Sequence, residues 1–126
     1  MAERYSSFNP GGRLWLWQRI TAAFLILVLA FHFFLLHFVH HADEVTFGMS
    51  AGRMQTWSYY SLMILFLVTA TFHGVNGIYN ALVSAGLTGT KRRVVKGVLL
   101  VASVLLLVQG FRTANAWAGI DLLPIL

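Results

Sequence analysis

The sequence predicts an all-α membrane protein with three transmembrane helices. Hydrophobic residues make up 58% of its 126 residues and charged residues only 10%, with a mean hydropathy of +0.72. A soluble domain carries about 25% charged residues, so this chain has too little polar surface to cover a water-soluble globule. Its apolar residues gather in three long runs, and its charges lie at the ends of those runs. The length fits one domain.

The first helix is expected over about residues 14–41. Its apolar run covers residues 20–39 and follows Trp15 and Trp17, a residue type that favours the membrane interface. About 20 apolar residues cross a bilayer as a helix. A cleaved signal peptide is the alternative, but the run is too long and no small-residue cleavage site follows Val39.

The second and third helices are expected over about residues 57–85 and 92–115. Their apolar runs cover residues 61–83 and 94–111, and aromatic residues flank both of them. Lys96 lies in the first turn of the third run, where a lysine side chain can extend to the lipid headgroups.

The positive charges predict a cytoplasmic N-terminus and an external C-terminus. Seven of the nine Lys and Arg residues lie on one side of the predicted spans, which the positive-inside rule assigns to the cytoplasm. These seven are Arg4, Arg13, Arg19, Lys91, Arg92, Arg93 and Lys96. The basic loop could attract an extrinsic partner, although orientation and headgroup contact explain it equally well. The chain has no cysteine, which excludes disulfides and thiolate metal sites.

The predicted spans contain no Asp or Glu, but they contain histidine. His32 and His37 fall in the first helix and His73 in the second. An imidazole inside a membrane is costly unless it has a partner, so each one suggests a function. One interpretation is a polar contact between helices. The other is haem ligation, because imidazole suits iron and a porphyrin needs an apolar slot.

Depth separates His32 from His73. At 1.5 Å per residue, His32 lies roughly 22 Å outward from Trp17, and His73 lies roughly 20 Å inward from Tyr60. In a core about 30 Å thick, the two histidines are on the order of 12 Å apart along the membrane normal. They therefore cannot bind the two faces of one haem. If both are ligands, they serve two haems, each completed by another chain.

The face of the second helix around His73 carries small and polar residues. Small residues let a flat macrocycle or another helix approach closely, and plain helix packing explains the same pattern. Thr69, one turn earlier, could orient the imidazole. His37 and the pair that follows it, His40 and His41, are expected at the interface or in water.

Two motifs resemble the membrane anchors of succinate dehydrogenase. They are W-Q-R-I-T at residues 17–21, with His32 thirteen residues after the arginine, and H-G-V-N-G at residues 73–77. The resemblance covers residues 15–111 and is closest to the hydrophobic anchor of two-haem archaeal and bacterial enzymes.

That resemblance implies a complex of a flavoprotein subunit, an iron–sulfur subunit and two three-helix anchors in the cell membrane of a prokaryote. The complex would oxidise succinate and pass electrons to a quinone, expected to be menaquinone. Two haems b would be shared between the anchors, with His32 ligating the distal haem and His73 the proximal one. Arg19 and Thr21 would contact a haem propionate or the quinone, and Gly77 would pack against haem.

One feature of the resembling family is absent. Many relatives carry an Asp-Tyr pair of the quinone site where this chain has Ser84 and Ala85. The quinone would then depend on the partner anchor, the iron–sulfur subunit, or Arg19 and Thr21. The alternatives are a fumarate reductase anchor, another quinone-linked cytochrome b, and a cofactor-free helical assembly subunit. No residue of the chain is expected to act as a catalytic acid, base or nucleophile.

Overall fold

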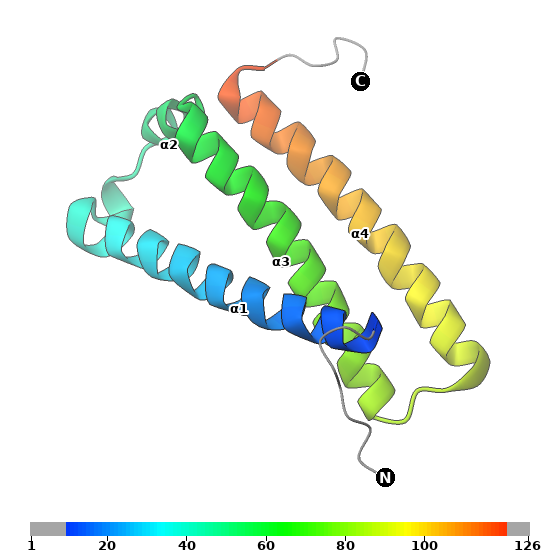
Figure 1. Ribbon diagram of the computed structural model, residues 1–126. Coiled ribbons are helices and arrows are strands. Elements are labelled where there is room, and N and C mark those ends of the chain that lie inside the picture. Colours follow the sequence, from blue (N-terminus) through cyan, green and yellow to red (C-terminus); the bar gives the residue numbers. More distant parts are fainter. Residues whose placement is uncertain (1–9, 121–126) are drawn as a thin grey trace.

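All regular elements of the described part of the chain are helical (Figure 1). The computed structural model describes residues 10–120. In chain order the elements are α1 (Pro10–Phe34), the π-helical turn η1 (Leu35–Val39), the 3-10 turn η2 (Ala42–Glu44), α2 (Phe47–Met54), α3 (Trp57–Ser84) and α4 (Gly89–Ala118). Three segments are long and apolar enough to cross a membrane: Gly12–Val39, Trp57–Ser84 and Gly89–Ala118. The predicted all-α fold with three such helices is confirmed.

The helix ends differ from the expected bounds at α1, which begins at Pro10 and passes into η1 after Phe34, and at α4. This helix begins at Gly89, so the basic residues expected in the preceding loop lie in its first two turns. The connection from α3 is correspondingly short, and Gly86 adopts a φ of 95° in it, a conformation that only glycine adopts without strain. α4 ends at Ala118, and the next residue, Gly119, caps it with a φ of 71°. Of the expected cytoplasmic charges, Arg4 lies outside the described residues.

The segment between the first two long helices contains a short helix that the sequence analysis does not predict. Thr46 begins α2 by accepting a hydrogen bond from the backbone N–H of Met49 at 3.3 Å. The Phe47 ring lies 4.5 Å from the Trp117 ring, centroid to centroid, so α2 packs against the end of α4. Helix capping and this aromatic contact outweigh the low helix propensity of Gly48 and Gly52.

Two ends of the bundle are distinguished below. The α2 end carries α2, the end of α1 and the start of α3; the basic end carries the start of α1 and the connection from α3 to α4. α3 lies between the other long helices: α1 crosses it towards the basic end and diverges from it towards the α2 end, whereas α4 runs antiparallel beside it (Figure 1).

The helices bury little of their apolar surface against one another. Val28, at 6% exposure, is the one hydrophobic side chain buried among residues 10–120, whereas Leu27 beside it is 70% exposed. Exposed leucine, valine and phenylalanine side chains cover the outer faces of α1 and α4. Such surfaces are compatible with lipid or with further helices.

Candidate functional site

Four polar side chains meet where α1 crosses α3. The Gln18 side-chain amide donates to the backbone carbonyl of His73 at 3.0 Å, and its oxygen accepts from the Asn76 amide at 2.7 Å. The Thr21 Oγ1 lies 3.1 Å from Nδ1 of His73. We call Gln18, Thr21, His73 and Asn76 the crossing cluster. It ties one turn of α1 to one turn of α3.

The local sequence explains why these side chains face each other. Gln18 and Thr21 are three residues apart, as are His73 and Asn76, so each pair shares one face of its helix. Gly77 extends the α3 face. A Cβ at Gly77 would lie 3.3 Å from Nε2 of Gln18, tighter than most contacts, so the glycine gives this amide its space.

The crossing cluster is shielded from the surroundings. Thr21 is 8% exposed, and Gln18, His73 and Asn76 are half-buried. Polar groups in such a position need hydrogen-bond partners, since water is not there to replace them. The contacts across the helix interface supply those partners.

His32 lies on the same face of α1 but nearer the α2 end. It is eleven residues beyond Thr21, about three turns of helix and about 16 Å along the axis. Its ring lies 6.4 Å from the ring of Tyr59, near the start of α3. Tyr59 is fourteen residues before His73, or about 21 Å along α3. Both helices therefore place His32 and His73 at separate depths.

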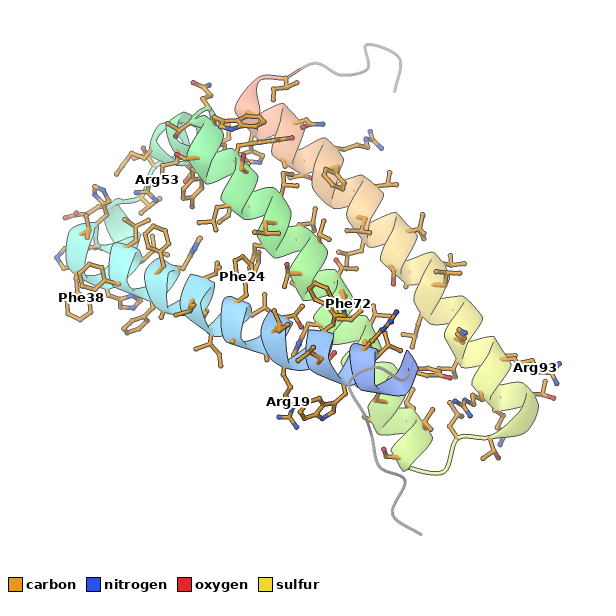
Figure 2. All side chains as sticks on the ribbon, in the orientation of Figure 1. Arg19, Phe24, Phe38, Arg53, Phe72 and Arg93 are labelled. Carbon is orange, nitrogen blue, oxygen red and sulfur yellow. The ribbon has the colours of Figure 1, made fainter. Side chains whose placement is uncertain are left out.

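The His32 side chain has an unmet hydrogen-bonding requirement. Its Nδ1 is buried and has no hydrogen-bond partner within residues 10–120. A buried polar nitrogen without a partner costs about 1–3 kcal/mol. Phe24, which shares this side of α1, points from α1 towards α3 (Figure 2). Nδ1 of His32 is therefore a buried ring nitrogen without a polar partner among the described residues.

The remaining histidines differ from these two. His37 is exposed, its ring stacks on Phe33 at 4.2 Å between centroids, and its Nδ1 lies 3.0 Å from the Phe33 carbonyl. His41 is exposed and His40 half-buried, both at the α2 end. All three lie in or beside the short turns that follow α1.

Arg19 stands apart from the crossing cluster. It is exposed, and its Cζ lies 5.2 Å from the centre of the Trp15 ring. Figure 2 shows its side chain on the side of α1 turned away from α3. Within this chain Arg19 therefore does not join Thr21 and His73, and it faces whatever covers the outer side of α1.

The structure thus brings together three of the five residues predicted for the site: Thr21, His73 and Gly77. His32 and Arg19 lie elsewhere. The partner of the His73 ring is Thr21 of α1 instead of Thr69 on its own helix. The sequence analysis includes Gln18 only in the motif at residues 17–21 and does not predict its contacts with His73 and Asn76. The signal was present, because Gln18 and Thr21 are a polar pair at helical spacing in an apolar segment.

A groove of about 600 Å³ lies between α3, α4 and the start of α1, and Asn76 of the crossing cluster is among its lining residues. Apolar residues such as Leu14, Phe72 and Leu100 line most of it, with Tyr79 and Lys96 among the polar exceptions. The Tyr79 hydroxyl accepts a hydrogen bond of 2.8 Å from Nε of Arg92. The groove is suited to an apolar chain with a polar or anionic end.

Among residues 10–120, no three His, Cys, Asp or Glu side chains gather into a metal-binding group.

Comparison with known proteins shows the family to which the chain belongs. The family described as succinate dehydrogenase/fumarate reductase transmembrane subunit matches residues 2–111. A succinate dehydrogenase hydrophobic membrane anchor subunit of Archaeoglobus fulgidus is 27% identical over 96 residues, which cover 76% of this chain and 81% of the relative. No solved structure matches the chain significantly. The family match spans far more than half of the sequence, so this chain belongs to the succinate dehydrogenase/fumarate reductase transmembrane subunit family.

Proposed function

We propose that this chain is a haem b-binding anchor of a succinate:quinone oxidoreductase, in which it helps to carry electrons from an iron–sulfur subunit towards quinone. The observation that carries the proposal is the placement of His32 and His73. The two imidazoles lie on one interface between α1 and α3, at separate depths, in a member of an anchor family.

The residues present fit haem. Nδ1 of His73 is engaged by Thr21, which leaves the other ring nitrogen for a ligand. Nδ1 of His32 is buried and has no hydrogen-bond partner among the described residues. His32 would hold the distal haem and His73 the proximal one. Bound haem supplies one-electron transfer, and the protein contributes the axial ligands and a low dielectric.

A partner anchor completes this site. Each haem needs a second axial ligand, and the exposed apolar faces of α1 and α4 offer surface for a second three-helix anchor. Arg19, whose side chain points away from α3, would contact a haem propionate or a quinone held partly by that partner. The iron–sulfur and flavoprotein subunits would join on the cytoplasmic side, with menaquinone as the acceptor in a prokaryotic cell membrane.

The test is a reduced-minus-oxidised optical spectrum of the purified complex with pyridine haemochrome quantitation. About two b-type haems per copy of this chain are expected. His32→Ala and His73→Ala should each remove a different haem. His37→Ala is the matched control, because His37 is an exposed histidine on the same helix, and it should retain both.

Two results would overturn parts of the proposal. A complex without haem would leave a cofactor-free assembly subunit. Loss of neither haem in the His32 and His73 variants would overturn the ligand assignment. Succinate oxidation and fumarate reduction, assayed in the same preparation, separate the dehydrogenase from a fumarate reductase anchor.

A further inference from the structure

We infer that Thr21 is a positioning residue that selects the tautomer of His73 from across the helix interface, so that Nδ1 carries the proton and Nε2 the lone pair. The inference about the tautomer concerns this chain alone. Its consequence for haem rests on the proposed function.

The contacts of the Thr21 hydroxyl determine which nitrogen of His73 carries the proton. A hydroxyl has one proton to donate and lone pairs to accept with. Oγ1 of Thr21 lies 2.8 Å from the Trp17 carbonyl oxygen and 3.2 Å from that of Gln18. It lies 3.1 Å from Nδ1 of His73. Carbonyl oxygens only accept, and the shortest contact is to one of them.

The hydroxyl proton therefore points back along α1, towards the two carbonyls. This is the usual bond of a threonine inside a helix to the carbonyl four residues earlier. A lone pair of Oγ1 is left facing His73, so Nδ1 is the donor in that contact. In a neutral imidazole the other nitrogen, Nε2, is then unprotonated and free to bind a metal.

Gln18 holds the backbone of the same histidine. Its amide donates to the His73 carbonyl, and Asn76 fixes which way that amide points by donating to its oxygen. Ring and backbone of His73 are thus both attached to one turn of α1. The position of α1 along α3 therefore determines where the imidazole points and which of its two nitrogens carries the proton.

A hydrogen-bond acceptor on the Nδ1 side also makes the imidazole a stronger electron donor. That favours ferric over ferrous iron in a haem bound at Nε2, and so lowers the reduction potential of that haem. Thr21 would act on the haem held by His73 and leave the haem held by His32 unchanged.

The test uses Thr21→Val, which keeps the side-chain shape and removes the hydroxyl, and Thr21→Ser, which keeps the hydroxyl. The first readout needs no haem. Solid-state NMR of the nitrogen-15-histidine-labelled full-length chain in phosphatidylcholine vesicles reports the protonated ring nitrogen, and the His73 signal is assigned from its loss in His73→Gln. The Nδ1-protonated tautomer is expected in wild type and Thr21→Ser, with an Nε2-protonated population appearing in Thr21→Val.

The second readout is a potentiometric titration of the purified complex. Thr21→Val should shift one haem midpoint to more positive potential, and Thr21→Ser should restore it. An Nε2-protonated His73 in wild type, or the same tautomer population in wild type and Thr21→Val, would overturn the inference. A chain that binds no haem would defeat the proposed function, and the NMR result would still decide the role of Thr21.

Discussion

The side-chain amide of Gln18 donates a hydrogen bond of 3.0 Å to the backbone carbonyl of His73, and so fastens α1 to α3 at the residue on which the proposed haem site depends. The same amide accepts from Asn76 on the next turn of α3. Polar contacts of this kind hold membrane helices together, because lipid is as apolar as the helix surfaces and gives them no reason to associate.

Replacing Gln18 should therefore weaken the crossing of α1 and α3. Gln18→Leu removes two bonds between helices, each worth about 0.6 kcal/mol on average in a membrane protein. We expect a loss of about 1–2 kcal/mol and a lower midpoint in thermal unfolding of the purified complex. Gln109→Leu makes the same change at an exposed position of α4 and should leave the midpoint unchanged. Equal effects of the two changes would contradict the role of Gln18.

Gly110 allows α4 to approach α3. A Cβ at Gly110 would lie 2.6 Å from both terminal methyl carbons of Leu67, whereas a Cβ at Gly97 on the same helix would meet nothing within 4 Å. Gly110→Ala should cost about 1–3 kcal/mol through overpacking. Gly97→Ala should be neutral or stabilising, since alanine is the better helix former.

The Gly110 effect should depend on Leu67. Leu67→Ala removes the methyl groups that a new Cβ would meet, so the two substitutions together should cost less than the sum of their separate effects. Thermal unfolding of the four variants measures this coupling. Strict additivity would mean that the clash is not the cause.

Tyr60 links α3 to α4 at the α2 end, where its hydroxyl donates to the Asn115 side-chain oxygen. Tyr60→Phe should reduce stability by about 0.6 kcal/mol, the usual size of a single bond between membrane helices. In a double-mutant cycle with Asn115→Ala, the second change should add little once the first is made. Tyr59→Phe is the neighbouring control and should show no coupling to Asn115.

The predicted orientation can be tested cleanly because the chain has no cysteine. Gln55→Cys places one exposed thiol at the α2 end, and Thr90→Cys places one at the basic end. A membrane-impermeant maleimide should label Gln55→Cys on intact cells and reach Thr90→Cys only after permeabilisation, as the positive-inside rule requires. The opposite pattern would invert the topology.

The bounds of the second long helix were predicted most accurately from the sequence. The second was expected over about residues 57–85 and is found at Trp57–Ser84, because aromatic residues and a glycine-containing turn bound an apolar run of membrane length. The sequence did not predict α2, an eight-residue helix in a polar, glycine-containing segment. This helix depends on the contact between Phe47 and Trp117, which are distant in the sequence.

Composition and the spacing of residues by themselves determined the membrane class, the number of spans and the separate depths of His32 and His73, because those properties follow from hydropathy and the fixed rise of a helix. Only the tertiary structure decided that Thr21, and not Thr69, meets the His73 ring, and that Arg19 faces away from α3. The physical reason is that such contacts depend on where and at what angle two helices cross. Small local features such as Gly77, Gly110 and the Gln18 amide set that angle, and no periodicity within one helix encodes it.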